Sequence, residues 1–162
     1  MDRAEYIEKL KIAYEGELYG EAWFGAMAER APTVDTRRKF AAMARLEILT
    51  KATLAPLIAK LGIVGINESE QREKGRLLAQ KTTELSWADF IAWFETEVAP
   101  FVEIYDELEA HAPAEEANVV AHLAQHERAL LEFIRREAAG QSDTSIAPIL
   151  SMLDSSSHYD AS

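Results

Sequence analysis

Apolar residues recur at alternating intervals of three and four residues in four separate stretches of this chain, and this period limits the possible folds more than any other feature. Each stretch is about 25 residues long, enough for about 38 Å of α-helix. The chain of 162 residues contains only five prolines and seven glycines, whereas a many-stranded sandwich or barrel needs a turn signal about every ten residues. We therefore expect an all-α fold built from four long helices.

Helix starts and stops separate the four stretches. Capping residues precede the second and third helices, a proline stands at the end of the first and at the start of the fourth, and a glycine follows the second and the fourth. The expected helices run from about Asp2 to Ala31, from a cap among residues 33–36 to Gly62, from Ser86, paired with Asp89 in a capping-box pattern, to about His111, and from Pro113 to Gly140.

The connections between these helices differ in length. The first and the last are a few residues long and predict antiparallel hairpins, whereas the middle one, from Gly62 to Leu85, exceeds twenty residues and contains a polar helix candidate at about Ser69 to Gln80. We therefore expect residues 1–140 to form two hairpins joined by one long crossover. Residues 141–162 are expected to form a tail, partly docked or flexible, in which the apolar run from Ile146 to Leu153 docks about one helical turn.

Charge and cysteine content exclude several functional classes. The chain has 17 Lys and Arg against 28 Asp and Glu, a formal net charge of −11, and a field of this sign repels nucleic acid and anionic membranes. There is no cysteine, so oxygen and nitrogen atoms would have to hold any metal. The first residues are charged and amphipathic and no apolar run approaches a membrane span. We expect a soluble, cytoplasmic protein with no nucleic-acid or membrane partner.

Four positions on the apolar stripes carry residues that a core does not tolerate without compensation. They are Glu17, Glu47, Glu97 and His126, one from each expected helix. A buried carboxylate without a partner costs several kcal/mol, so it is normally protonated, paired with a cationic side chain or bound to a cation. No Lys or Arg falls on the four stripes.

The spacing of these residues from the expected turns predicts that they meet. Glu17 and Glu47 each lie about 15 residues from the first turn, so they should be level and face each other. Glu97 and His126 lie about 16 and 13 residues from the second turn, a mismatch of about one helical turn that side chains can bridge. All four are expected near mid-height.

Three carboxylates and one imidazole would make an oxygen-rich site suited to iron or manganese, and less selectively to zinc. His122 could supply a second nitrogen or form an interhelical hydrogen bond, and Glu21 could add a carboxylate or only accept a hydrogen bond. Alternatives stay open at single positions. Glu17 could be exposed or protonated, and His126 could be a core histidine whose hydrogen bonds are satisfied within the protein. If Pro100 shifts the phase of its helix, Glu103 would point inward instead of Glu97. Thr50 is expected to bond the carbonyl one turn back.

The segment from Gly16 to Phe24, a Gly-Glu pair followed by an aromatic about seven residues later, resembles the rubrerythrin-like branch of the ferritin-like superfamily. The resemblance covers residues 2–139 and implies a ferritin-like four-helix bundle with a long crossover between the second and third helices. In that family a Glu from each of two helices and a Glu-x-x-His motif from each of the other two bind two metal ions. Glu17, Glu47, Glu97 and His126 fall on matching positions.

The sequence also departs from the family pattern. Thr50 stands where the motif beginning at Glu47 has histidine, and Pro100 stands where the branch has a further glutamate. The fourth helix has His122 and Gln125 where carboxylates are expected, and the cysteines of a rubredoxin domain are absent. One ion, an irregular pair of ions and an empty site are all compatible with this pattern.

Two functions follow as hypotheses. The first is a metal-binding ferritin-like protein with Glu17, Glu47, Glu97, His122 and His126 as candidate ligands. It would hold one or two iron ions, or manganese or zinc instead; as a non-haem iron oxidoreductase acting on oxygen or peroxide, it would depend on an external electron donor. The alternative is a metal-free helical bundle acting as a binding or assembly module. A homodimer is expected for this fold, and the substrate is not readable from the sequence.

Overall fold

The computed structural model describes residues 1–156, and within this range it contains six helices and no strand. The last part of the expected tail, residues 157–162, lies outside the described residues. The helices are α1 (Arg3–Arg30), α2 (Val34–Lys60), α3 (Glu68–Thr82), α4 (Trp87–Ala110), α5 (Ala117–Ala138) and α6 (Ala147–Ser156). The all-α class expected from the periodicity is confirmed.

Side-chain caps fix the starts of α1, α2, α3 and α4. Thr33 and Thr36 form a reciprocal capping box at the start of α2, and the Oγ of Ser86 accepts a hydrogen bond of 3.2 Å from the backbone N–H of Asp89 at the start of α4. Gly62 takes a positive φ of 64° just after α2, a backbone conformation that favours glycine and ends the helix. These boundaries agree with the predicted ones within about two residues.

The start of α5 differs from the prediction. Pro113 belongs to a separate turn, in which the N–H of Glu116 donates to the carbonyl of Pro113 at 2.8 Å, and α5 begins only at Ala117. The carboxylate of Glu116 is buried and accepts a hydrogen bond of 3.0 Å from Arg3 of α1. This contact ties the turn to the N-terminal end of α1.

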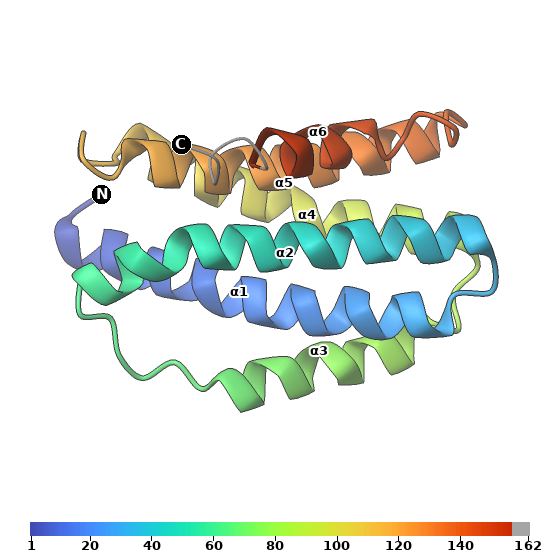
Figure 1. Ribbon diagram of the computed structural model, residues 1–162, viewed down its shortest axis with the longest axis horizontal. Helices are drawn as coiled ribbons and strands as arrows, with labels where there is room; N and C mark the ends of the chain where they lie inside the picture. The colour runs from blue at the N-terminus through green and yellow to red at the C-terminus, as the bar shows by residue number, and fades with distance from the viewer. Residues whose placement is uncertain (157–162) are drawn as a thin grey trace.

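The two minor helices are longer than expected. α3 extends beyond the predicted range of residues 69–80 at both ends, and α6 has ten residues where one turn was expected. α3 packs against α1, with Gly75 at the closest approach, whereas α6 packs against α5 and α2. Both therefore cover the outside of the four long helices (Figure 1).

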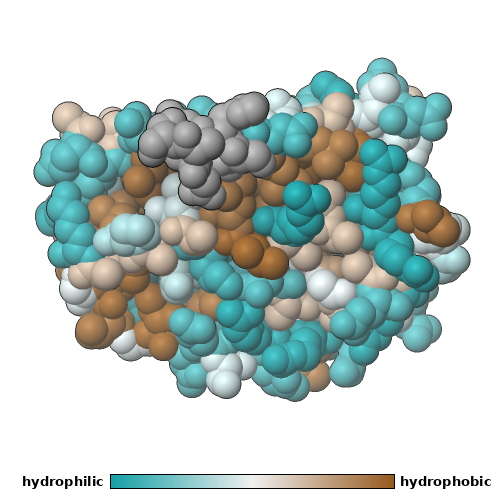
Figure 2. Space-filling view, viewed as in Figure 1, coloured by the Kyte–Doolittle hydropathy of each residue, from teal (hydrophilic) through white to brown (hydrophobic). Residues whose placement is uncertain are grey.

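The four long helices lie side by side (Figure 1). α1 packs against α2 and α4 against α5, and the two pairs meet through contacts of α2 with α5 and of α1 with α4. In the orientation of Figure 1, α1 and α5 run from left to right, and α2 and α4 run in the opposite direction. Hydrophilic residues cover much of the face seen in Figure 2, with separate apolar patches between them.

The core consists of two apolar clusters, one towards each end of the long helices. On α1 the clusters are separated by the stretch between Ala13 and Trp23, on α2 by that between Leu46 and Leu54, and on α5 by that between Ala124 and Leu130. The polar residues Glu17, Glu47 and His126 occupy these three intervals. The gap in the apolar core thus coincides with the predicted mid-height of the acids.

None of the helices within residues 1–156 is long and apolar enough to cross a membrane.

Candidate metal centre

Three buried side chains converge from three helices: Glu17 of α1, Glu47 of α2 and His126 of α5. Their exposed fractions are 1%, 4% and 1%. The Nε2–H of His126 donates to Oε1 of Glu47 at 3.0 Å, and Nδ1 of His126 lies 3.5 Å from Oε1 of Glu17. One ligand atom from each residue lies within 4.8 Å of the others, so a single cation could contact all three after small side-chain movements.

Glycine on α1 makes room for the carboxylate of α2. A Cβ atom added at Gly20 would lie 2.5 Å from Oε2 of Glu47 and 2.7 Å from its carboxyl carbon. The absence of a side chain at Gly20 therefore lets Glu47 extend past α1 into the centre. The prediction that Glu17 and Glu47 face each other at one level is confirmed by this packing and by the distances above.

Two buried polar atoms of this cluster have no hydrogen-bond partner among the described residues: Oε2 of Glu17 and Nδ1 of His126. Burial raises the pKa of Glu17 well above its usual range, despite the opposing effect of His126. Burial lowers the pKa of His126, but the carboxylates of Glu17 and Glu47 outweigh it and raise the pKa to about 10. These shifts favour the protonated forms of Glu17 and His126 near neutral pH, so a cation that binds between them would displace their protons.

Glu127 is a fourth acidic side chain at this place, and the sequence prediction missed it. It is 8% exposed, and its Oε2 also lacks a hydrogen-bond partner. Burial raises the pKa of Glu127 to about 7, although His126 beside it acts in the opposite direction. Glu127 directly follows the stripe residue His126. Because the buried face of a helix is wider than a single stripe, a residue beside the stripe can also be buried, and this position was the signal in the sequence.

Glu97 does not lie in the core as predicted. Its side chain is exposed, whereas Phe94 and Val98 on either side of it are buried. The predicted stripe kept a strict three–four alternation through α4, but an α-helix has 3.6 residues per turn, so the buried face drifts to Val98 and Tyr105. Glu103, the alternative inward residue, is also exposed.

His122 lies one turn before His126 and is half-buried outside the cluster. Its Nε2 shares a hydrogen bond of 3.2 Å with the hydroxyl of Thr50. This is the interhelical bond weighed against a ligand role for His122. Thr50 makes it instead of the expected bond to the carbonyl one turn back. Burial lowers the pKa of His122, which keeps its imidazole neutral.

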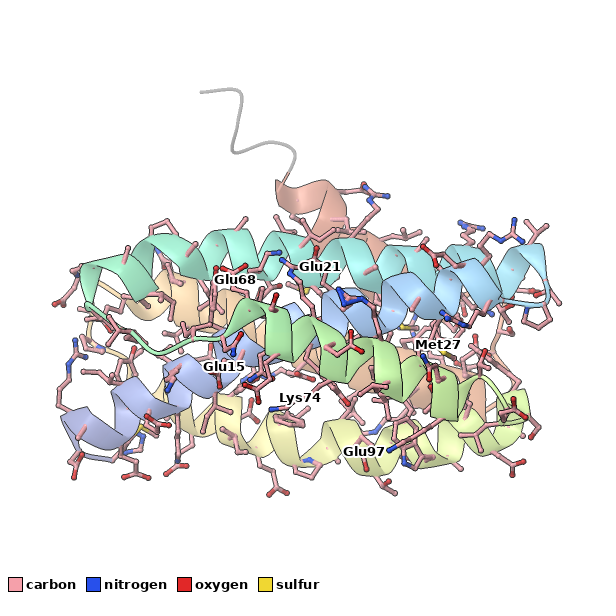
Figure 3. All side chains as sticks on the ribbon, turned by 90° about the horizontal axis from the view of Figure 1, so that it is seen from below. Glu15, Glu21, Met27, Glu68, Lys74 and Glu97 are labelled. Carbon is pink, nitrogen blue, oxygen red and sulfur yellow. The ribbon has the colours of Figure 1, made fainter. Side chains whose placement is uncertain are left out.

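Glu21 points away from the cluster and is neutralised by cationic side chains. It pairs with Lys51 of α2 and, at 3.0 Å, with Arg72 of α3. Figure 3 shows Glu21 and Glu68 where α3 crosses α1. Glu21 therefore accepts hydrogen bonds and adds no carboxylate to the centre.

The carboxylate of Glu137 shows how this chain neutralises a buried acid without a metal. Its Oε1 lies 2.7 Å from Nζ of Lys39, and both side chains are buried. Trp87 and Ser145 donate further hydrogen bonds to Glu137. Glu137 thus has a lysine and several hydrogen-bond donors around it, whereas Oε2 of Glu17 has no donor among the described residues.

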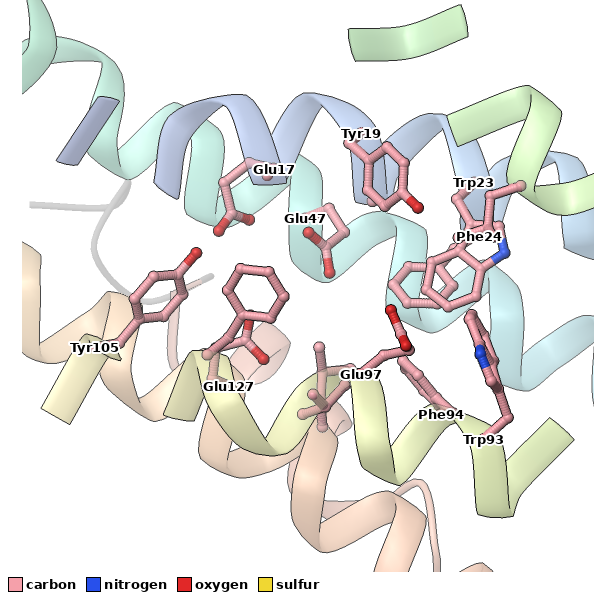
Figure 4. A pocket seen from close by; sticks show the side chains of 16 residues that line it. Glu17, Tyr19, Trp23, Phe24, Glu47, Trp93, Phe94, Glu97, Tyr105 and Glu127 are labelled. Carbon is pink, nitrogen blue, oxygen red and sulfur yellow. The ribbon is translucent and has the colours of Figure 1, made fainter. Parts of the chain in front are cut away.

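The side chains around the cluster also line a cavity of about 90 Å³ between α1 and α4 (Figure 4). Glu17, Glu47 and Glu127 lie at its buried end, and the exposed Glu97 lies nearer to solvent. The structure therefore brings together Glu17, Glu47 and His126 of the five candidate ligands, places Glu97 on the cavity wall and leaves His122 outside.

No family model matches this sequence, and neither a curated protein nor a solved structure shows significant similarity to it.

Proposed function

We propose that this protein binds one divalent transition-metal ion, iron or manganese in preference to zinc, between Glu17, Glu47 and His126. The observation that carries the proposal is the unpartnered, fully buried Oε2 of Glu17 beside a second carboxylate and an imidazole. If Glu17, Glu47 and Glu127 are all ionised, their three negative charges exceed the single positive charge of a protonated His126, and without a bound cation a proton on Glu17 relieves this excess. A bound cation removes this cost, since uncompensated buried charge is worth several kcal/mol.

The donor set supports one ion better than two. Two carboxylates and one imidazole suit iron or manganese, but a second ion would need further ligands. Thr50, which stands where a second histidine would be expected, instead bonds His122. The second set of ligands is therefore incomplete.

We further propose that the chain is a ferritin-like four-helix bundle of the rubrerythrin-like group. The order of the helices supports this assignment: two hairpins, α1 with α2 and α4 with α5, are joined by a long segment that carries α3 along α1 (Figure 1). This connection lets α4 run in the same direction as α2, as a crossover requires. The homodimer and the cytoplasmic location stay predictions.

A bound iron ion would supply one-electron redox chemistry towards oxygen or peroxide, with electrons from an external donor. The chain's own residues have simpler tasks at this site. Glu17 and Glu47 provide negative charge and oxygen ligands, His126 provides nitrogen, and Gly20 positions Glu47. The apolar clusters on both sides shield Glu17 and Glu47 from solvent except along the cavity between α1 and α4.

The second candidate is a metal-free bundle that serves as a binding or assembly module. One observation favours it: a protonated His126 between Glu17 and Glu47 already forms a compact ion triad. This candidate and the metalloprotein make opposite predictions for metal content.

Metal analysis separates the two candidates. Protein purified without chelator is incubated with Mn(II), or with Fe(II) under anaerobic conditions, and then desalted. Its metal content per chain is measured by elemental mass spectrometry. We expect about one ion per chain in the wild type and a loss of at least about tenfold in affinity for Glu47→Gln, which keeps the side-chain volume but removes the charge. Glu137→Gln, which removes the Lys39-paired carboxylate, is the matched control and should retain the metal.

Circular dichroism of both variants shows whether they keep the helical fold. A wild-type protein that remains far below one ion per chain, or a folded Glu47→Gln that binds metal as well as the wild type, would contradict the metal centre.

A further inference from the structure

The cavity beside the cluster has a chemical character of its own. Aromatic rings form much of its wall: Tyr19, Trp23, Phe24, Trp93, Phe94 and Tyr105 (Figure 4). Phe101, which is 38% exposed, also lines it and connects it with the surface. The cavity therefore offers apolar contact area that is accessible from solvent.

Every charged side chain that lines this cavity in residues 1–156 is acidic. Glu97 lies on its exposed side and Glu127 at its buried end, and no lysine, arginine or histidine of the described chain contributes to the lining. An anion entering the cavity would be repelled, and a cation would be attracted.

The buried end also contains an unsatisfied acceptor. Oε2 of Glu127 has no hydrogen-bond partner, and this residue is 8% exposed. Figure 4 shows its carboxylate at the cavity together with that of Glu97. A ligand with N–H donors and a positive charge would satisfy the acceptor and balance the charge together.

We propose that this cavity binds a small organic ammonium ion whose nitrogen donates hydrogen bonds to Glu127. Glu97 attracts the cation at the entrance, and the short hydrocarbon part packs against Trp23 and Phe94. Aromatic faces contribute to such binding because their π-electrons attract cations. A volume of about 90 Å³ has room for several water molecules, so the ligand has only a few non-hydrogen atoms.

This ligand is distinct from the metal ion proposed above. The metal would use Glu17, Glu47 and His126, whereas the ammonium ion depends on Glu127, Glu97 and the aromatic wall. The experiment therefore uses chelator-treated protein, so that its outcome does not depend on whether a metal binds.

Three probes of similar size isolate the role of charge: n-propylammonium, propan-1-ol and propionate. Binding is followed by calorimetry and by the NMR signals of the tryptophan indole N–H groups at constant ionic strength. We expect n-propylammonium to bind at least about tenfold more tightly than propan-1-ol and propionate not to bind. The signals of Trp23 and Trp93 should shift, whereas that of Trp87, which does not line the cavity, should not.

Two variants test the acidic groups. Glu127→Gln should weaken n-propylammonium binding about tenfold and Glu97→Gln about threefold, whereas the exposed Glu103→Gln on the same helix should have no effect. If Glu127→Gln does not fold, the affinity of Glu97→Gln for n-propylammonium decides the test, because a change at an exposed position leaves the core intact. Equal affinity for the amine and the alcohol, no detectable binding of the amine, or unchanged affinity in the folded Glu97 and Glu127 variants would overturn the proposal.

Discussion

Nε2 of His126 lies 3.0 Å from Oε1 of Glu47, a residue 79 positions earlier in the chain, and both side chains are buried. The contact joins α2 to α5 at the point where the apolar core is interrupted. A second carboxylate, Glu17, lies on the other side of the same imidazole. One imidazole thus faces two buried acids, and the predictions on metal binding below rest on this arrangement.

Gly20→Ala should separate metal binding from folding. The new Cβ would lie 2.5 Å from Oε2 of Glu47, and the flexible end of this side chain would have to move. Metal affinity should fall by at least about tenfold, while the helix gains from alanine's propensity of about 1 kcal/mol. Metal content after desalting and a thermal melt measure the two effects.

Gly25→Ala on the same helix is the matched control, because a Cβ there would meet nothing within 4 Å. It should raise stability by about 0.5 to 1 kcal/mol and leave metal binding unchanged. A Gly20→Ala protein that binds metal like Gly25→Ala would show that the position of Glu47 is not critical.

His126→Asn and His122→Asn should differ although the two residues are one helical turn apart. His126→Asn removes the nitrogen of the cluster and should abolish stoichiometric metal binding. His122→Asn removes the hydrogen bond to Thr50 and should cost about 1 kcal/mol of unfolding free energy without changing the metal content. Equal loss of metal in both variants would make His122 a ligand as well.

The sequence was sufficient to predict those parts of the fold that depend on local signals. The apolar period gave four long helices, and the caps at Thr33 and Ser86 and the glycine at Gly62 gave their ends. Counting residues from a short turn also predicted that Glu17 and Glu47 meet. In an antiparallel helix pair, two residues that are equally far from the turn lie at the same height.

The sequence was insufficient where the outcome depended on packing between helices. Glu97 was assigned to the core because a fixed heptad-like period ignores the drift of a 3.6-residue helix, and α4 buries Val98 and Tyr105 instead. Glu127 was missed because only the packing of α5 against its neighbours determines how wide its buried face is. The same limit applies to Glu116, whose contact with Arg3 bridges distant parts of the chain.

Gly75→Ala should destabilise the fold without touching the acidic cluster. Its Cβ would collide with the carbonyl oxygen of Tyr19 and lie 2.9 Å from the backbone nitrogen of Trp23. Because a backbone cannot move aside as a side chain can, α3 would be forced away from α1. We expect a loss of at least about 2 kcal/mol in denaturant unfolding, and a variant as stable as the wild type would refute this packing.

The Lys39–Glu137 pair should make stability depend on acidic pH. Burial raises the pKa of Glu137, but hydrogen bonds from Lys39, Ser145 and Trp87 outweigh it and hold the pKa below its usual value of 4.5. The contribution to stability is therefore complete above this value and is lost as the pH falls below it towards the folded-state pKa.

Glu137→Gln, which cannot titrate, shows the effect by comparison. It should be less stable than the wild type by about 3 kcal/mol near neutral pH, and the difference should shrink as the pH falls from about 6 to about 3. Denaturant unfolding at several pH values measures it. A difference that stays constant over this range would mean that the pair does not stabilise the fold through its charges.

The most direct test of the metal centre is anomalous X-ray diffraction from crystals of the protein grown with Mn(II) or with Fe(II) under anaerobic conditions. The account predicts one anomalous peak about 2.1 Å from a carboxylate oxygen of Glu17, from a carboxylate oxygen of Glu47 and from one ring nitrogen of His126. Well-ordered electron density for these three side chains, with His126 bridging the two carboxylates and no anomalous peak between them, would contradict it.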